Sequence, residues 1–155
     1  MKIVIIYDSV FGNTQKLAEE MGEVLKGNKV DILKPAQATS SIIEKADVVI
    51  VGSPTRAFNP TKEISAFLKS IPAKYLKGKK ALAFDTRMNI EEMNSKVFNF
   101  FEKVFGYAGE NIEKSLMKKG ADMLLPHEGF FVKDSEGPLA DGELERAKNW
   151  VEVLK

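Results

Sequence analysis

Short apolar runs that alternate with helix-like stretches constrain the fold of this chain more than any other sequence feature. Three of these runs, at residues 3–7, 48–51 and 81–84, consist only of aliphatic and aromatic residues. Such runs are typical of strands buried on both faces of a parallel sheet. A stretch with helical periodicity follows the first run, at residues 15–25. Strands that alternate with helices predict an α/β fold, with a parallel sheet covered by helices on both faces.

Two further strands complete the predicted sheet. Residues 29–33 alternate apolar and polar side chains, which indicates a half-exposed strand near a sheet edge. The fifth strand begins at residues 121–125, breaks at 126–129 and resumes at 130–132. Other helices are expected at residues 42–46, 61–71, 90–105, 110–119 and 144–154. At 155 residues, we expect the whole chain, residues 1–155, to form one domain.

The composition narrows the classes of function. The formal net charge of +1 gives no general attraction to nucleic acid, and we expect no nucleic-acid partner. The absence of cysteine excludes disulfides and thiolate metal sites, and no metal-ligand spacing occurs elsewhere. No apolar stretch reaches the roughly 20 residues of a membrane span, and the first apolar run is too short for a signal peptide. We therefore expect a cytoplasmic protein without a membrane span.

The loop at residues 8–14 joins the first apolar run to the first helical stretch. Such a junction exposes backbone N–H groups at the positive end of a helix dipole, which suits a phosphate. Ser9, Asn13 and Thr14 add neutral donors. Gly12 allows the backbone to approach a ligand closely. Because the loop contains no lysine or arginine, any phosphate there would be held by neutral donors.

Two other loops should join the first at one edge of the sheet. They follow the third and fourth strands, at residues 52–60 and 85–89. Ligands of open α/β sheets bind beyond the carboxyl ends of the strands, where the strand order reverses. We therefore predict a ligand site between the three loops. Asp85, at the start of the last loop, is more typical of loop solvation or helix capping than of acid–base catalysis.

The residues of these loops resemble those of the flavodoxin family. The run IIYDSVFGNT at residues 5–14 resembles the loop that binds the FMN phosphate, and GSPT at 52–55 and DTR at 85–87 resemble the two flavin-ring loops. EGPL at 136–139 and GELERA at 142–147 resemble the ending of small stand-alone members. The resemblance implies a flavodoxin-like doubly wound five-stranded sheet of order 2-1-3-4-5, for which flavodoxin itself is the standard example. The fold that the resemblance implies is of the short-chain type, with an extra helix after strand four.

The resemblance also implies that FMN is the cofactor, bound without a covalent bond. The phosphate loop would contribute Ser9, Val10, Phe11, Gly12, Asn13 and Thr14. The first ring loop would contribute Pro54, Thr55, Arg56, Ala57, Phe58 and Asn59. The second ring loop, at the pyrimidine edge, would contribute Asp85, Thr86, Arg87 and Met88.

The ring loops also depart from the family pattern. Many members have a glycine beside flavin N5, but residues 55–58 contain none, so a positive φ there is expected to be costly. Arg56 and Arg87 lie in the two ring loops, and we hypothesise that one of them raises the reduction potential of the flavin. The extra helix at residues 90–105 follows the second ring loop, and its off-stripe residue Phe98 suggests a cap or contact surface near the ring. For most residues of this helix, the expected role is only to pack its apolar stripe on the sheet.

The resemblance implies an electron-transfer protein, and we expect a redox carrier without catalytic residues. Its partners would be a reductase or an iron–sulfur protein, and it would act as a monomer or weak homodimer. An alternative is an FMN-dependent oxidoreductase that acts on a quinone or another small molecule, with the ring capped by the extra helix. A third possibility is a binding module that keeps the fold without flavin.

Overall fold

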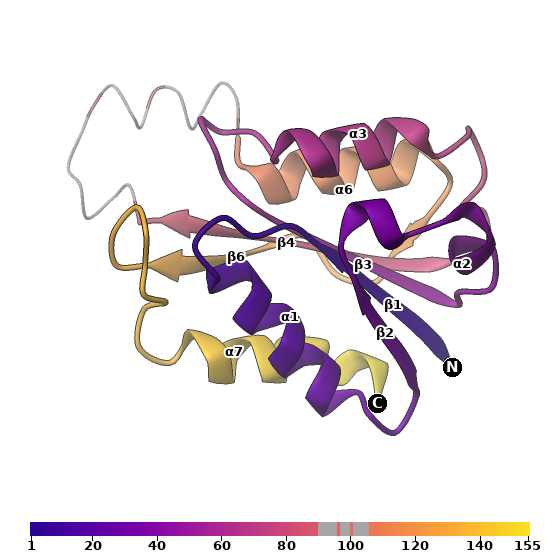
Figure 1. Ribbon diagram of the computed structural model, residues 1–155, viewed down its shortest axis with the longest axis horizontal. Helices are drawn as coiled ribbons and strands as arrows, with labels where there is room; N and C mark the ends of the chain where they lie inside the picture. Colours follow the sequence, from indigo (N-terminus) through magenta and orange to yellow (C-terminus); the bar gives the residue numbers. More distant parts are fainter. Residues whose placement is uncertain (90–95, 97–99, 101–105) are drawn as a thin grey trace.

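The computed structural model describes residues 1–89, 96, 100 and 106–155, and it places a parallel sheet between two layers of helices (Figure 1). The strand order is β2-β1-β3-β4-β5, as predicted, and β6 also pairs with β4. Every pair of neighbouring strands is parallel. The strands are β1 (Lys2–Tyr7), β2 (Lys29–Leu33), β3 (Val48–Pro54), β4 (Lys80–Met88), β5 (Asp122–Met123) and β6 (Glu128–Val132).

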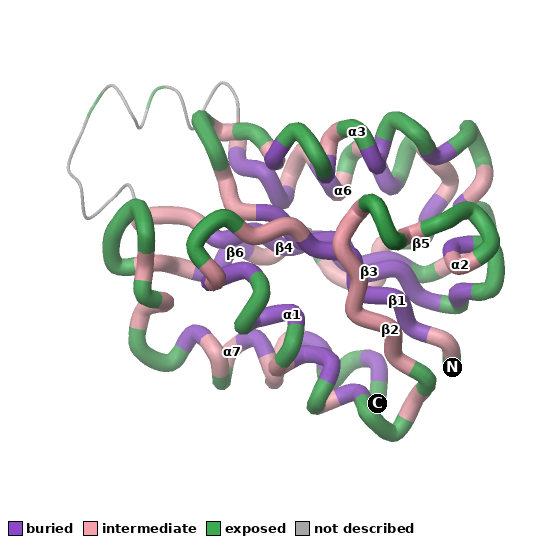
Figure 2. The backbone as a smooth tube through the Cα atoms, viewed as in Figure 1, coloured by how far each residue is buried: buried purple, intermediate pink, exposed green. Residues whose placement is uncertain are grey.

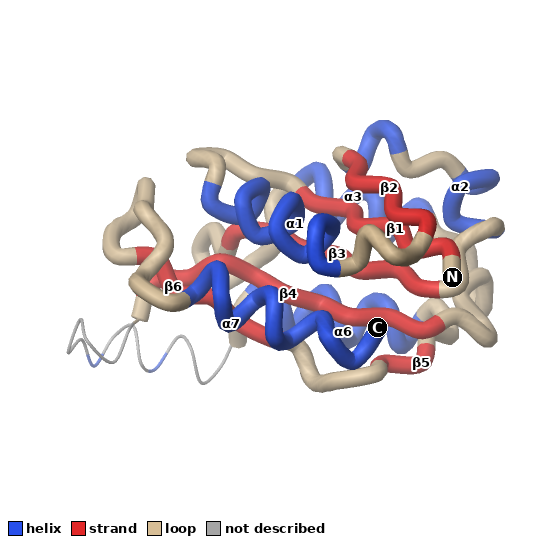
Figure 3. Tube along the Cα trace, turned by 90° about the horizontal axis from the view of Figure 1, so that it is seen from below, coloured by secondary structure: helices blue, strands red, loops and turns tan. Residues whose placement is uncertain are grey.

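Two layers of helices cover the sheet. The helices are α1 (Asn13–Val24), α2 (Ser40–Glu44), α3 (Lys62–Ser70), α6 (Ala108–Lys118) and α7 (Glu143–Trp150), with 3₁₀ turns at Pro35–Gln37 and Val151–Leu154. α1 and α7 cover one face, whereas α3 and α6 cover the other (Figures 1 and 3). These helices lie close to their predicted ranges. The helix predicted over residues 90–105, with Phe98, falls outside the described residues except at positions 96 and 100.

The core consists of two apolar clusters, one on each face of the sheet. Val4 and Ile6 of β1 belong to the cluster under α2, α3 and α6, whereas Ile3 and Ile5 belong to the cluster under α1 and α7. Successive residues of a strand point to opposite faces, so a continuous apolar run supplies both clusters. Figure 2 shows β1 and β3 as mostly buried and β2, at the sheet edge, as half-buried. Among the described helices, none has the length and apolar character needed to cross a bilayer.

β4 extends further than its apolar run predicts. Asp85, Thr86, Arg87 and Met88 were expected in a loop, but they form the carboxyl-terminal half of this strand. The reason is that β6 supplies a partner strand over this stretch, from the pair Phe84↔Glu128 to the pair Met88↔Val132. β3 likewise extends to Pro54, which was also expected in a loop and pairs with Thr86.

The fifth strand of the predicted sheet is divided in two. β5 pairs with the first two residues of β4, and β6 pairs with its last five. The break that the sequence places at residues 126–129 is therefore present, although β6 already begins at Glu128. As a result, β6 ends beside the carboxyl end of β4, at the edge of the sheet where the predicted ligand site lies.

Candidate functional site

A cleft of about 320 Å³ lies at the carboxyl ends of β1, β3 and β4, where the three predicted loops meet. Its position follows the rule for open α/β sheets. The predicted site residues that line it are Ser9, Val10, Phe11, Asn13, Thr14, Pro54, Thr55, Arg56, Ala57, Thr86, Arg87 and Met88. The remaining predicted residues do not line the cleft, namely Gly12, Phe58, Asn59 and Asp85.

The cleft has a fourth wall that the sequence reasoning missed. Val132 at the end of β6 and Ser135 in the following loop also line the cleft. This loop packs against the first one, because the Asn13 side-chain amide donates a hydrogen bond to the Glu136 carbonyl oxygen at 3.1 Å. The signal was available in the sequence, since the loop after the last strand lies at the same sheet edge as the others.

The amino-terminal turn of α1 provides free backbone donors at one end of the cleft. Phe11, Asn13 and Thr14 line the cleft, and no hydrogen bond among the described residues uses their backbone N–H groups. The first N–H groups of any α-helix lack an acceptor within the helix. Gly12 adopts a φ of 93°, which lets the chain turn sharply into α1. Donors and the positive end of the helix dipole together suit a phosphate.

The side chains predicted as phosphate donors are mostly engaged within the protein. The Asn13 amide donates to the 133–138 loop, and the Thr14 hydroxyl lies 3.0 Å from the Thr86 hydroxyl. Ser9 Oγ accepts from the N–H groups of Gly12 and Gln15, at 3.1 and 3.4 Å. The Ser9 hydroxyl proton is therefore still available to a ligand. The cleft offers backbone donors more than the side-chain donors that the sequence suggested.

The first ring loop contains a tight turn in a strained conformation. Arg56 and Asn59 exchange two backbone hydrogen bonds, at 2.8 and 3.0 Å, around Ala57 and Phe58. Ala57 has a φ of 48° and Phe58 a φ of 67°, the pattern of a type I′ turn, which normally uses Asn and Gly. The loop therefore adopts a positive φ at two residues without glycine, the conformation that was expected to be costly there.

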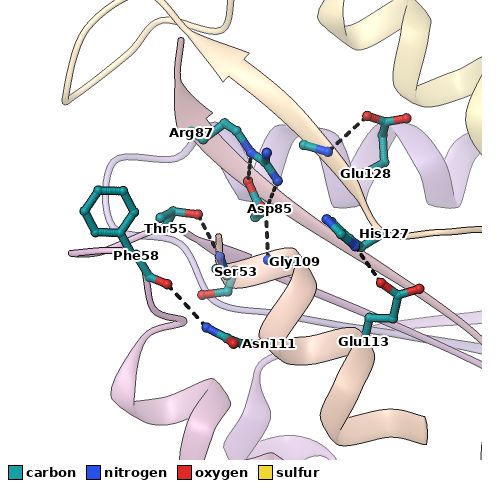
Figure 4. A network of polar contacts seen from close by, with 12 residues as sticks. Ser53, Thr55, Phe58, Asp85, Arg87, Gly109, Asn111, Glu113, His127 and Glu128 are labelled. Atoms are coloured by element: carbon teal, nitrogen blue, oxygen red, sulfur yellow. Dashed lines mark hydrogen bonds and ion pairs between the residues drawn. The ribbon is translucent and has the colours of Figure 1, made fainter. Parts of the chain in front are cut away.

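Contacts around this turn oppose its strain. The Asn59 side-chain amide donates to the Ala57 carbonyl oxygen at 3.0 Å. The Asn111 side-chain amide of α6 donates to the Phe58 carbonyl oxygen at 3.3 Å (Figure 4). The Phe58 and Tyr107 rings also lie close together, with centroids 6.3 Å apart. The turn is thus fixed from its own loop and from the start of α6.

Asp85 does not line the cleft, but it binds two residues close to it, Arg87 and Gly109. It is fully buried and accepts hydrogen bonds from Arg87 Nε at 2.7 Å and from the Gly109 N–H of α6 at 2.8 Å (Figure 4). The Arg87 guanidinium also stacks 3.6 Å from the centroid of the Tyr107 ring. A side chain at Gly109 would collide with Asp85, because a Cβ atom there would lie 2.6 Å from its carboxylate. Asp85 therefore caps α6, as expected for this carboxylate, but it is not solvated.

The two arginines of the cleft differ in electrostatic environment. Arg87 is paired with the buried carboxylate of Asp85 and is therefore largely neutralised. Arg56 is exposed and has no carboxylate within 4 Å among the described residues. Its guanidinium carbon lies 5.7 Å from the centroid of the Phe11 ring, so the two side chains meet at the mouth of the cleft. Within the described part of the chain, no carboxylate therefore compensates the positive charge of Arg56 beside the cleft.

The chemistry of the lining suits binding rather than acid–base catalysis. None of the described residues that line the cleft carries a carboxylate or an imidazole. Backbone donors lie at one end, and the walls combine apolar and polar side chains. This arrangement fits a ligand with an anionic tail and a flat body, and FMN has both.

Comparisons with known proteins identify the same type of fold. A family model described as the flavodoxin domain matches residues 4–123. The structure is similar to that of oxidised Flavodoxin 1 from Bacillus cereus, with 20% identity, a TM-score of 0.75, and coverage of 97% of this chain and 95% of that chain. It is also similar to a flavodoxin from the domain Archaea, with 21% identity, a TM-score of 0.73, and coverage of 97% and 94%.

A third similar structure is much longer than this chain. It is the rubredoxin oxygen:oxidoreductase from Desulfovibrio gigas, with 23% identity and a TM-score of 0.71, and the match covers 97% of this chain but 34% of that chain. At these identities the structural likenesses establish the shared fold. A search of curated protein sequences gave no significant match.

Proposed function

Because this chain belongs to the flavodoxin family, we propose that it is an electron carrier that passes electrons between redox partners. Members of the family bind FMN, which supplies one- and two-electron transfer when it is bound. The observation that carries the proposal is the cleft beyond β1, β3 and β4, with free backbone donors of α1 at one end. No side chain needs to act as a nucleophile or base in this function.

The lining residues divide into two groups in this proposal. The N–H groups of Phe11, Asn13 and Thr14 and the hydroxyl of Ser9 hold the phosphate. The walls formed by residues 54–57 and 86–88 hold the flavin ring. The predicted residues outside the lining have supporting roles, because Gly12 shapes the first loop and Asp85 orients Arg87.

The test of cofactor binding is a titration of the purified full chain with FMN, followed by absorbance and by quenching of flavin fluorescence. We expect FMN to bind at least about tenfold more tightly than riboflavin. Only FMN has a phosphate that can accept hydrogen bonds from the free backbone N–H groups at the start of α1. Equal affinities would contradict the phosphate assignment. A chain that takes up no flavin would instead be a binding module that keeps the fold alone.

A second experiment separates a carrier from an enzyme. The FMN-loaded chain is mixed with NADH or NADPH, with and without a nicotinamide-dependent reductase for flavodoxins, and flavin bleaching is recorded. A carrier is reduced only when the reductase is present, and it then passes electrons to an acceptor such as an iron–sulfur protein. Rapid direct oxidation of NADH or NADPH would favour the oxidoreductase alternative. That alternative depended on the helix predicted at residues 90–105, which lies outside the described residues except at positions 96 and 100.

A further inference from the structure

A groove of about 350 Å³ lies between α3 and α6. These two helices cover the face of the sheet opposite α1 and α7 (Figure 1). We call the groove between them the α3–α6 groove. Its two sides present the same types of polar group in the same order along the chain, which is asparagine, serine and lysine. These residues are Asn59, Ser65 and Lys69 on one side and Asn111, Ser115 and Lys118 on the other.

The α3–α6 groove is positively charged at one end. Lys69, Lys118 and Lys119 line it there, and none of them has a carboxylate within 4 Å among the described residues. No described residue of the lining is acidic. The nearby carboxylates of α6 are engaged elsewhere, because Glu110 pairs with a lysine at 2.8 Å and Glu113 with His127 at 2.5 Å. The lysines are therefore available to an anionic ligand.

The length of the groove favours an extended chain over a small anion. Asn111 and Lys118 lie on one helix and are separated by about 10 Å, at about 1.5 Å per residue. An extended peptide covers this distance with about three residues, at about 3.3 Å each. The amide and hydroxyl groups can then pair with peptide groups while the lysines pair with carboxylates. A single phosphate would reach only one end.

The other end of the groove adjoins the candidate cofactor cleft. Asn59 closes the strained turn of the first ring loop, and Asn111 donates to the Phe58 carbonyl oxygen of that turn (Figure 4). A ligand in the α3–α6 groove therefore contacts residues that hold one wall of the cleft. Its position beside the cleft is suitable for a protein that exchanges electrons with the cofactor.

We propose that the α3–α6 groove docks an acidic segment of a partner protein and so positions that partner beside the cleft. This inference rests on the proposed electron-carrier function. The lysines attract the acidic partner over a distance and set its orientation, while the polar groups along the groove determine its register. Salt weakens the interaction, because the charges lie at the protein surface.

The test uses the full chain labelled with ¹⁵N and loaded with FMN, titrated with a hexaglutamate peptide while backbone amide shifts are recorded. We expect saturable shifts at Ser65, Lys69, Ser115 and Lys118, and a loss of most of the response between about 20 and 300 mM salt. We expect the double variant Lys69→Glu/Lys118→Glu to bind the peptide at least about tenfold more weakly. The neutral double variant Lys69→Gln/Lys118→Gln should give an intermediate loss.

The matched control is Lys29→Glu/Lys45→Glu, which makes the same charge change at exposed lysines outside the groove. Circular dichroism and FMN affinity show that each variant is folded. If the control variant loses as much affinity for the peptide as the groove variant, the effect is only a general attraction between opposite charges, and the proposal is wrong. Shifts elsewhere, no shifts, or the same shifts with inorganic phosphate would also overturn it. The titration is repeated without FMN, so a failure of cofactor binding is distinguished from a failure of docking.

Discussion

Ala57 and Phe58, in the type I′ turn, adopt a positive φ that residues with a Cβ atom disfavour. For a residue with a Cβ atom, the left-handed region costs roughly 1–2 kcal/mol. Such strain persists only where the surrounding structure determines it, and it concentrates at ligand sites. Here the surrounding contacts come from Asn59 and Asn111, which bond the two carbonyl groups of the turn. The turn therefore forms a preset wall of the cleft.

The variant Ala57→Gly should make the protein more stable. Glycine adopts a positive φ without strain, so we expect the free energy of unfolding to rise by about 1 kcal/mol. Urea unfolding followed by circular dichroism measures this change. The control is Ala66→Gly at an exposed position within α3, where we expect a loss of about 1 kcal/mol. A destabilised Ala57→Gly variant would show that Ala57 does not adopt a positive φ in solution.

The charge of Arg56 should affect the reduction potential of bound FMN. Arg56 is exposed without a carboxylate partner among the described residues, so its field acts on the cleft. We expect Arg56→Gln to lower the potential by an amount on the order of tens of millivolts, because a positive charge stabilises the reduced flavin. Arg56→Lys, which keeps the charge, should retain most of the potential. If a redox titration gives the same reduction potential for the original protein and for both variants, the hypothesis is wrong.

At the scale of elements, Asp85 links β4 to the start of α6. Its carboxylate joins the guanidinium of Arg87, on the same strand, to the Gly109 N–H in the first turn of α6. Asp85 and Arg87 are two positions apart, so both project from the same face of the sheet. This contact ties the first turn of α6, beside the groove, to β4, beside the cleft.

The variant Asp85→Asn should destabilise the fold by about 3 kcal/mol, because it leaves a largely buried guanidinium without its counter-charge. The Gly109 amide should exchange its hydrogen faster than in the original protein. In the double variant Asp85→Asn/Arg87→Met the loss should be smaller than the sum of the single losses by more than about 1 kcal/mol. Additive losses would mean that the two side chains act independently. Asp122→Asn, at an exposed position of β5, serves as the control.

The elements differ in how well the sequence predicts them. Helices with an apolar stripe, such as α3, and the buried run of β1 are recognisable because a local pattern produces them. The second half of β4 was assigned to a loop because its strand character depends on pairing with β6, which comes much later in the chain. No local pattern contains that information. The helix at residues 90–105 stays a prediction.

At the scale of the whole molecule, the location of the candidate cleft was predictable, whereas the surroundings of each residue in it were not. The strand order alone places the ligand beyond the carboxyl ends of the strands, and the cleft lies there. Asp85 could not be recognised as buried, because its burial depends on how α6 packs on the sheet. Val132 and Ser135 were missed because the loop after β6 was treated only as a turn.

The stability of the molecule should depend on pH through Glu143. This nearly buried carboxylate accepts hydrogen bonds from Arg146 and from the Phe131 N–H of β6, at 2.7–2.9 Å. Burial raises the pKa of Glu143, but these hydrogen bonds outweigh it, so the pKa lies below its ordinary value of 4.5. Ionised Glu143 therefore stabilises the fold above that value, and its contribution is lost as the pH falls through the lowered pKa.

We expect Glu143→Gln to reduce the free energy of unfolding by about 2 kcal/mol at neutral pH. The difference from the original protein should shrink as the pH falls from the ordinary pKa through the lowered one, because Glu143 is protonated in both states only below the lowered pKa. Urea unfolding at a series of pH values measures it. Glu145→Gln, at an exposed position two residues further along α7, should change stability by less than about 0.5 kcal/mol at any pH. A constant difference across the series would contradict the linkage.

The division of the fifth strand also affects how the molecule behaves in a crowded solution. An uninterrupted edge strand offers a row of unpaired backbone groups to which another chain can add, and this is a common route to aggregation. Here that edge consists of two short strands, β5 and β6, separated by a break that contains Pro126. Glu128 adds a charge where β6 begins. This edge is therefore a poor template for the addition of a strand from another chain.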